Sequence, residues 1–564
     1  MKPSLSLSAL TLSLGFAGLA GAQTAQPLAA SLPAGALLTL ETHDAEPALE
    51  RLTGLLSGVV GAAGKLAGEE DGEGAGRADA VVGAAQTILS DLLGREGVAG
   101  VFAVQGPRGT FSPELLAVAR AGDLAGEVLG GGLPDKPGAR VGNYAFSRVG
   151  SVFAGQSGEL LYVSTDKALL MSYLGRLSGK AAPTLAASAP YAAATRAAGP
   201  QELSLYANFS AVAKVVRSQL ARTGLPRLLS PVVDALDTLG QYAGGLTTTG
   251  EGMTTASAQV VNPAGKDAPL RRILGATTDF AVQDIIPADA ESVQASACAP
   301  ESQAYLGRWL TRLDLFEPFG FLTDSQLASH LERSGTYLGG ECARVSLAGG
   351  TLAGLEVSDP AASLRYTVTY QRVTDQAAAE AHMPEYARSV NEAIEGLRGN
   401  FKTLLGSSIG ALSGLGMGGS GLSAAEVAAL TRESAGTSLD DLDTLLGKLK
   451  LVYGFRDGYL VTAFSPEALA AAMDPAAPAL GQSEAFKAAG LTLKGSGGWS
   501  YQPDLPEISS EALAGALPEG EEGEMAAPFM DVLADLVNRY DGMTSQRSVQ
   551  GNVIISKANV LYRW

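Results

Sequence analysis

The segment GELLYVSTD, residues 158–166, decides the fold because a similar segment recurs later in the chain. An Ala-Leu pair follows it at residues 168–169, and GYLV at residues 458–461 is likewise followed by an Ala-Leu pair at 468–469. In both places a glycine precedes a short apolar run typical of a strand, and the Ala-Leu pair then begins a helix. A segment that recurs together with its neighbours indicates an internal duplication.

Two further segments recur in the same order. LPAGA at residues 32–36 and IPADA at residues 286–290 each precede a strand and a helix. Nearer the end of each half, a tyrosine and a Gly-x-Thr segment precede a closing strand, at residues 242–247 and 540–544. The shared order of the three matches predicts a tandem duplication.

The duplication predicts two pseudo-symmetric α+β domains, the first at residues 23–270 and the second at residues 280–564. Their strands alternate apolar and polar side chains, as at 203–207 and 364–370, which favours largely antiparallel sheets. Ala- and Leu-rich segments between the strands predict amphipathic helices that pack on these sheets. Helices are expected at residues 47–66, 80–93, 228–242 and 528–540.

The second domain is expected to carry an insertion. The offset between matching positions is 254 for Pro33 and Pro287 (287 − 33) and 300 for Gly158 and Gly458 (458 − 158), so it grows by 46 positions (300 − 254). Residues 390–440 are rich in Gly, Ser, Ala and Leu and poor in aromatics. This composition predicts helices joined by a flexible Gly/Ser loop.

These segments resemble a known family. The Leu-Pro-Ala opening at residues 32–34, the GELLYVSTD segment and the Ser-x-x-Tyr at residues 188–191 with its following strand are similar to the large, uncharacterised bacterial exported family described as domain of unknown function 3352. The resemblance extends over most of the chain after residue 22. It implies export and the duplicated architecture, and it brings no activity, cofactor or site residue with it.

Residues 1–22 predict a cleavable secretory signal. Lys2 supplies the positive n-region, residues 5–19 carry no charge, and the small residues at 20–22 suit signal peptidase, with cleavage between Ala22 and Gln23. A membrane anchor is the alternative, but Ser, Thr and Gly interrupt the apolar stretch, which is shorter than the roughly 20 apolar residues of a span. The Gly- and Ser-rich stretch at 403–425 is also too polar to span a membrane. We therefore expect an exported protein, periplasmic or associated with the cell envelope, without a transmembrane span after cleavage.

The charge of the chain limits its partners. The formal net charge is −18, from 40 Lys and Arg against 58 Asp and Glu. Such a surface repels phosphate backbones, and no Lys/Arg cluster offers a local exception, so nucleic acid is not expected as a partner. Cationic or neutral partners remain open.

The chain has two cysteines, Cys298 and Cys342. In an oxidising compartment a lone pair predicts one disulfide, and both lie beside expected strands, 292–297 and 342–347, that could be neighbours in one sheet. Two buried free thiols are the alternative. A bridge over 44 positions (342 − 298) would stabilise the fold by roughly 3 to 4 kcal/mol in the chain-entropy model.

Two short motifs suggest catalysis, and their context disfavours both. Gly406 to Gly410 fits the nucleophile-elbow pattern around Ser408, but no histidine follows it, and the preceding segment predicts a helix instead of a strand. Residues 414–419, GLGMGG, fit the dinucleotide fingerprint, but no apolar strand precedes them. We interpret both as small-residue turns, and expect no catalytic residue and no cofactor.

Metal-ligand residues are sparse. The three histidines, His43, His330 and His382, are far apart, and His43 beside Glu41 and Asp44 is interpreted as a solvated turn at a strand end. The acidic runs at 69–73 and 519–524 lack the alternating ligands of an EF-hand and are interpreted as solvated loops. No metal site is expected.

The sequence therefore favours an exported, non-enzymatic envelope protein that acts as a binding or scaffolding module for an envelope protein or a small molecule. The first alternative is a periplasmic carrier of a hydrophobic ligand such as a lipid, because the small and aliphatic helix residues could leave a cavity. The second is an exported hydrolase with a non-standard site. The oligomeric state is left open.

Overall fold

The computed structural model describes residues 28–43, 45, 48, 51, 96–105, 111–120, 138–223, 226–313, 324–347, 362–414, 446–504, 509–510, 530, 534–535 and 537–564. These residues belong to two compact units. Unit 1 comprises Met1–Gly275, Glu519–Asp541 and Arg547–Trp564, and unit 2 comprises Ala276–Pro518 and Gly542–Gln546. The predicted signal and its cleavage site at Ala22 and Gln23 lie outside the described residues.

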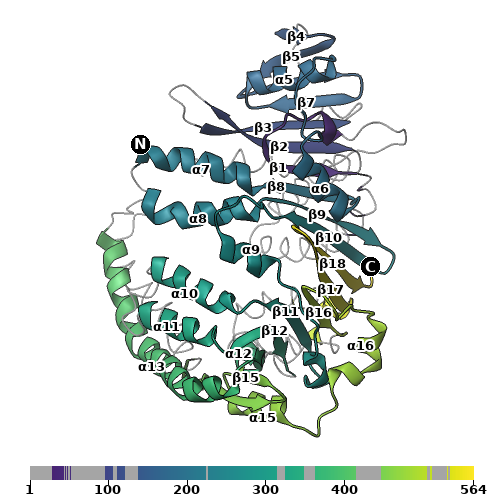
Figure 1. The fold of residues 1–564 in the computed structure, drawn as a ribbon. Helices are drawn as coiled ribbons and strands as arrows, with labels where there is room; N and C mark the ends of the chain where they lie inside the picture. The colour runs from purple at the N-terminus through teal and green to yellow at the C-terminus, as the bar shows by residue number, and fades with distance from the viewer. Residues whose placement is uncertain are drawn as a thin grey trace, which may run out of the picture. The chain divides into compact units, whose positions relative to one another are not determined.

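Unit 1 is a large antiparallel sheet with helices. Its elements are η1 (Leu28–Ser31), β1 (Ala36–Thr42), β2 (Gly97–Gln105), β3 (Phe111–Arg120), β4 (Ala139–Val141), β5 (Tyr144–Val149), β6 (Val152–Ser157), β7 (Leu160–Ser164), α5 (Lys167–Leu177), α6 (Ala189–Ala198), β8 (Leu203–Asn208), α7 (Phe209–Thr223), α8 (Pro226–Leu239), β9 (Gln241–Thr249), β10 (Gly252–Val260), α9 (Ala268–Leu274) and β18 (Val553–Tyr562). Hydrogen bonds connect the strands in the order β4-β5-β6-β7-β3-β2-β1-β8-β9-β10-β18, and every pair is antiparallel (Figure 1).

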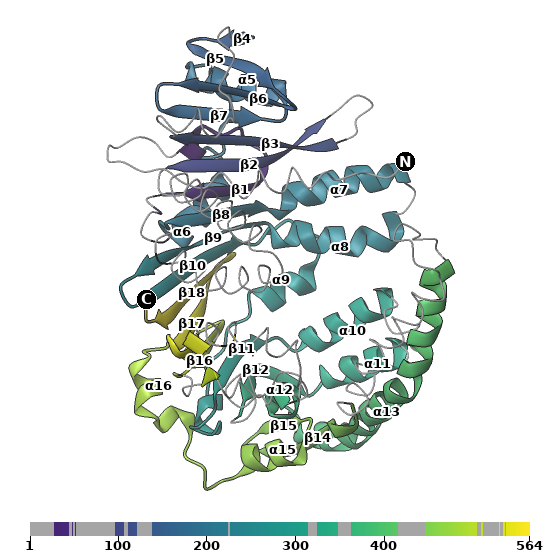
Figure 2. The ribbon, with the colours of Figure 1, turned by 180° about the vertical axis from the view of Figure 1, so that it is seen from behind.

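The helices of unit 1 pack against its sheet and against one another, and α5 shows how the sequence sets the start and the buried face of a helix. The carboxylate of Asp166 caps α5 by accepting the N–H of Leu169 at 2.6 Å, and α5 then buries Leu170, Tyr173 and Leu174 in the core. Helix α6 contacts β9, β10 and β18, while α7 contacts β1 and β9. Helices α7 and α8 lie side by side (Figure 2).

Unit 2 is also an antiparallel sheet with helices. Its elements are η4 (Val282–Asp284), β11 (Ser292–Cys298), α10 (Glu301–Leu313), α11 (Asp324–Ser334), β12 (Leu338–Ser346), α12 (Ala362–Arg365), β13 (Thr367–Val373), α13 (Gln376–Gly414), β14 (Val452–Arg456), β15 (Tyr459–Ala463), α15 (Pro466–Met473), η6 (Leu480–Gln482), α16 (Glu484–Ala488), β16 (Gly498–Gln502) and the middle of β17 (Tyr540–Gln550). The strands pair in the order β16-β11-β12-β13-β15-β14.

The two units connect their strands in the same way. In unit 1 the order β6-β7-β3-β2-β1-β8 corresponds, strand by strand along the chain, to β14-β15-β13-β12-β11-β16 in unit 2. The segment before the first strand of each unit is fixed by the same kind of backbone hydrogen bond, from Leu185 to the carbonyl of Leu32 at 2.9 Å and from Leu480 to the carbonyl of Ile286 at 2.8 Å. All four of these side chains are buried.

The α+β class with a large antiparallel sheet is confirmed, and two local expectations are wrong. The segment 364–370 is not one strand, because its first residues continue α12, whose Ala, Leu and Arg favour helix, and β13 begins at Thr367. The helix expected to reach Tyr242 ends at Leu239, because Gly240 at φ +71° breaks it and β9 follows.

Other expectations are tested in part. The final strand was expected to close the second domain, but β18 pairs along its length with β10 and belongs to unit 1. Helix α13 covers the expected insertion as far as Gly414, and the rest of 390–440 lies outside the described residues, as do the expected helix at 80–93 and most of the expected helix at 47–66. Of the helix expected at 528–540, residues 530, 534–535 and 537–538 are helical, but it does not reach residue 540, where β17 begins. None of the helices in the described ranges combines the length and apolar character needed to cross a membrane.

Candidate ligand site in unit 1

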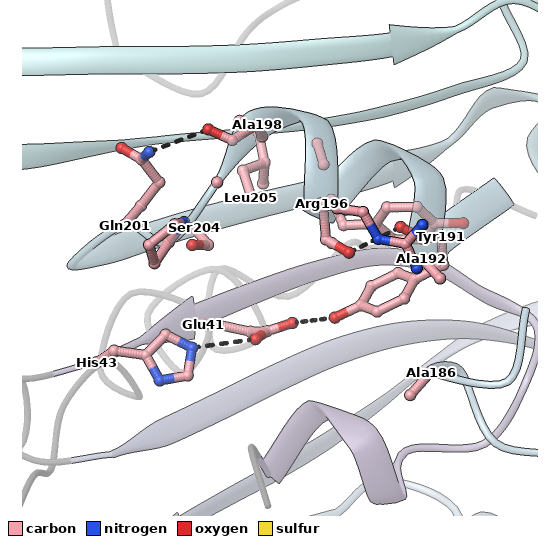
Figure 3. A pocket seen from close by; sticks show the side chains of 16 residues that line it. Glu41, His43, Ala186, Tyr191, Ala192, Arg196, Ala198, Gln201, Ser204 and Leu205 are labelled. Carbon is pink, nitrogen blue, oxygen red and sulfur yellow. Dashed lines mark hydrogen bonds and ion pairs between the residues drawn. The ribbon is translucent and has the colours of Figure 1, made fainter. Parts of the chain in front are cut away.

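A pocket of about 710 Å³ lies between helix α6 and the sheet of unit 1 (Figure 3). Strands β1, β8 and β9 and the loop after α6 supply the other walls. Small residues leave this space open: Ala192 and Ala198 on the helix and Gly244 on the sheet line it. Its volume lies in the range of roughly 300 to 1,000 Å³ that is usual for small-molecule sites.

Glu41 is the buried charge of this pocket. Its carboxylate Oε1 accepts the hydroxyl of Tyr191 at 2.8 Å, and Oε2 lies 3.3 Å from Nε2 of His43. Glu41 lies in β1, His43 directly follows the end of that strand, and Tyr191 comes from α6. Glu41 is only 7% exposed. The pocket therefore contains a carboxylate that the fold has removed from bulk water.

Glu41 shifts the pKa values of the two side chains that contact it, Tyr191 and His43. Burial, and then the charge of Glu41, raise the pKa of Tyr191 far above its ordinary value, so Tyr191 is a neutral hydroxyl donor at all physiological pH. The hydrogen bond to Glu41 raises the pKa of His43 above 6.5, although burial opposes it. The pocket thus holds two groups that donate hydrogen bonds to one carboxylate.

The remaining lining is mixed. Tyr206 packs edge-on against Tyr191, with ring centroids 4.8 Å apart. Arg196 also lines the pocket from an exposed position on α6. Gln201 lines it as well, and its buried Oε1 has no hydrogen-bond partner among the residues that the structure describes.

The interpretation of this segment as a solvated turn at a strand end is wrong for Glu41, which lies within β1, is buried and accepts the hydroxyl of Tyr191. His43 does lie in a bend directly after β1, and its side chain is partly exposed. Asp44 lies outside the described residues. One local signal pointed to the site: Glu41 stands at a position of β1 that alternates with buried Thr39 and so faces the interior. No local signal pointed to Tyr191, which is 150 positions away.

A second polar cluster lies in unit 2, where α11 packs against α13. His330 Nδ1 lies 2.9 Å from Nε2 of His382, whose Nδ1 lies 2.8 Å from the hydroxyl of Tyr337. His330 Nε2 lies 3.1 Å from the hydroxyl of Ser389. His382 is fully buried, and burial, with the charges of Arg333 and His330, lowers its pKa to about 4. The two histidines are far apart in the sequence, and helix packing brings them together across 52 positions.

This cluster does not form a recognisable metal site. No group of three or more His, Cys, Asp or Glu residues suited to a metal ion occurs among the described residues. Tyr337, Met383 and Tyr386 also line a pocket of about 220 Å³ between the helices and the sheet of unit 2. We interpret the histidine cluster as a hydrogen-bonded seam between α11 and α13.

The structure also locates the two cysteines and parts of the two motifs found in the sequence. Cys298 and Cys342 form the predicted disulfide, with their Cα atoms 5.8 Å apart, because β11 and β12 are paired neighbours. Residues 406–410, with Ser408, lie within helix α13, so the small-residue turn expected there is wrong, and there is no strand-to-helix turn at Ser408. Of the GLGMGG motif only Gly414, the end of α13, is described, and the acidic runs at 69–73 and 519–524 lie outside the described residues.

Comparisons with known proteins add no relative: no family model, no curated protein and no solved structure matches the chain.

Proposed function

We propose that the protein is an exported binding protein that holds a small organic ligand in the pocket between α6 and the sheet of unit 1. The observation that carries the proposal is the buried Glu41 carboxylate at an open pocket. Taking a carboxylate out of water costs several kcal/mol unless hydrogen bonds compensate it. Tyr191 and His43 provide two donors, whereas a carboxylate can accept about four. The remaining acceptor capacity is available to a ligand.

Export from the cytoplasm is part of this proposal. The predicted signal at residues 1–22 and the Cys298–Cys342 disulfide support a location in the periplasm or cell envelope, because structural disulfides persist in oxidising compartments. Membership of the exported family that the sequence resembles also belongs to the proposal. So does a tandem duplication, which the shared strand order of the two units supports.

A hydrolase is the second candidate, because Ser204 lines the same pocket as His43 and Glu41. These are the residue types of a serine hydrolase triad. Among the described residues no hydrogen bond joins Ser204 to His43, so the nucleophile lacks its base in this conformation. A fluorophosphonate probe that labels the native protein, but not Ser204→Ala, would favour hydrolysis over binding.

Extraction and mass spectrometry test the binding function. The protein is isolated gently from its own envelope, denatured, and the released small molecules are compared with those from two variants. Ala192→Phe places a ring in the pocket, whereas Ala193→Phe changes the next residue of α6, which does not line it. A stoichiometric compound released by the wild type and by Ala193→Phe, but not by Ala192→Phe, supports the proposal. The same yield from all three proteins contradicts it.

A further inference from the structure

We infer that the ligand of this pocket carries an ammonium or other N–H donor that binds Glu41, and that Trp499 fills the corresponding place in unit 2. The inference rests on the proposed function and specifies its ligand class. Residues that both units share at corresponding positions are required by the fold, whereas residues found in unit 1 alone point to a role beyond folding.

Strand register defines the corresponding positions. In unit 1, Thr39 pairs with Tyr206 and Glu41 pairs with Ser204 across β1 and β8. In unit 2, β11 and β16 correspond to β1 and β8, and they pair Val293 with Tyr501 and Ala295 with Trp499. The same backbone bond ends both pairings, from His43 to the carbonyl of Glu202 at 2.8 Å and from Ala297 to the carbonyl of Gly497 at 3.0 Å.

The helix residue above these strands also corresponds. Tyr191 of α6 packs edge-on against Tyr206, with centroids 4.8 Å apart. Phe486 of α16 packs edge-on against Tyr501, with centroids 5.3 Å apart. Phe486 therefore stands where Tyr191 stands, and it lacks only the hydroxyl.

Three differences between the units occur together. Glu41, Tyr191 and Ser204 in unit 1 correspond to Ala295, Phe486 and Trp499 in unit 2. Trp499 is 2% exposed and packs edge-on against Phe486 and Phe280, at 5.3 and 6.2 Å. The tyrosine hydroxyl is thus present where the carboxylate is present, and both are absent where an indole occupies the space.

It follows that the fold does not need Glu41. Unit 2 builds the same strand pairing and the same aromatic contact with uncharged residues, although the buried indole N–H of Trp499 has no hydrogen-bond partner among the described residues, and so it avoids the cost of a buried carboxylate. Unit 1, in contrast, has the buried carboxylate of Glu41 beside an open pocket. A buried charge that packing does not require is best explained by a ligand that it binds.

The chemistry of the lining identifies the ligand class. Glu41 has unused acceptor sites, and the buried Oε1 of Gln201 is another acceptor without a partner among the described residues. The hydroxyl of Tyr191 already donates its hydrogen bond to Glu41, so it is not available to donate one to a ligand. Arg196 is exposed, so solvent screens its charge more than the charge of buried Glu41. The net charge of −18 also favours the approach of cations. A primary amine with a compact apolar body fits these features.

The test uses three probes with one ring: cyclohexylmethylamine, cyclohexylmethanol and cyclohexanecarboxylate. Isothermal titration at pH 7 measures their binding to the full exported chain. The amine is expected to bind most tightly, and Glu41→Gln to weaken it about tenfold or more, since hydrogen bonds to a charged group are the strong ones. A triple variant, Glu41→Ala, Tyr191→Phe and Ser204→Trp, imports the residues of unit 2. It is expected to stay folded and to lose binding.

The outcomes separate the two claims. Tighter binding of the carboxylate or the alcohol, abolished by Ala192→Phe, would overturn the amine inference and leave the pocket a ligand site. Equal amine affinity for the wild type and the triple variant would also overturn it, because binding would then not depend on Glu41. If none of the probes binds and the native protein releases no ligand, both the inference and the proposed function fail.

Discussion

Glu341 of β12 lies 3.5 Å from the guanidinium of Arg372 on the neighbouring strand β13, and its other oxygen accepts the backbone N–H of Val282 at 3.1 Å. Unit 1 contains the same arrangement: Glu96 pairs with Arg120 and accepts the N–H of Leu28 at 3.0 Å. In both units one carboxylate ties the turn before the first strand to the second and third strands. This network is structural, in contrast to Glu41, which occurs in unit 1 alone.

Glu341→Ala is therefore expected to destabilise the protein strongly. The substitution leaves the backbone N–H groups of Ala281 and Val282 without their acceptor and removes the partner of Arg372. Breaking such a buried network costs about 3 kcal/mol or more of unfolding free energy. Urea denaturation measures it. Glu392→Ala, at an exposed position of α13, is the matched control and should change stability by no more than about 0.5 kcal/mol.

Tyr191→Phe should destabilise unit 1, and a second substitution should restore it. The single change deprives buried Glu41 of one of its two donors, which costs about 1 to 3 kcal/mol. Adding Glu41→Ala removes the unsatisfied carboxylate and reproduces the Ala295 and Phe486 pair of unit 2. A double-mutant cycle by denaturant unfolding should show this recovery. Simple additivity of the two destabilisations would be evidence against the coupling.

Stability is expected to fall in mild acid because of His382. Its folded pKa of about 4 lies below the ordinary 6.5, so the unfolded chain binds the proton first. The contribution is complete above pH 6.5 and is lost progressively as the pH falls from 6.5 to about 4, by about 3 kcal/mol. Unfolding curves of the wild type and His382→Gln across this range isolate it. The variant should show a flatter dependence, and parallel curves would exclude His382 as the cause.

Removal of the disulfide should lower stability without changing the fold. The bridge joins residues separated by 44 positions, and its loss should reduce the unfolding free energy by roughly 3 to 4 kcal/mol in the chain-entropy model. Thermal unfolding of Cys298→Ser with Cys342→Ser measures this. Reductant should lower the melting temperature of the wild type and have no effect on the double variant. An effect of similar size on both proteins would contradict the assignment.

The sequence predicted the features that depend on local pattern. Alternation located β8 within a residue of its observed bounds, and two cysteines beside adjacent strands predicted the disulfide. The polar sites could not be predicted, because they depend on how distant elements pack. Tyr191 reaches Glu41 from 150 positions away, and His330 meets His382 across 52. Strand register and helix docking set these contacts, and neither leaves a periodic signal in the sequence.

The most direct test of ligand binding by unit 1 is native mass spectrometry of the protein purified gently from its own envelope, beside the triple variant Glu41→Ala, Tyr191→Phe and Ser204→Trp prepared in the same way. We predict one bound small molecule per wild-type chain, lost on denaturation, and a bare chain for the variant. Bare chains in both preparations, or the same bound mass on both, would contradict the account.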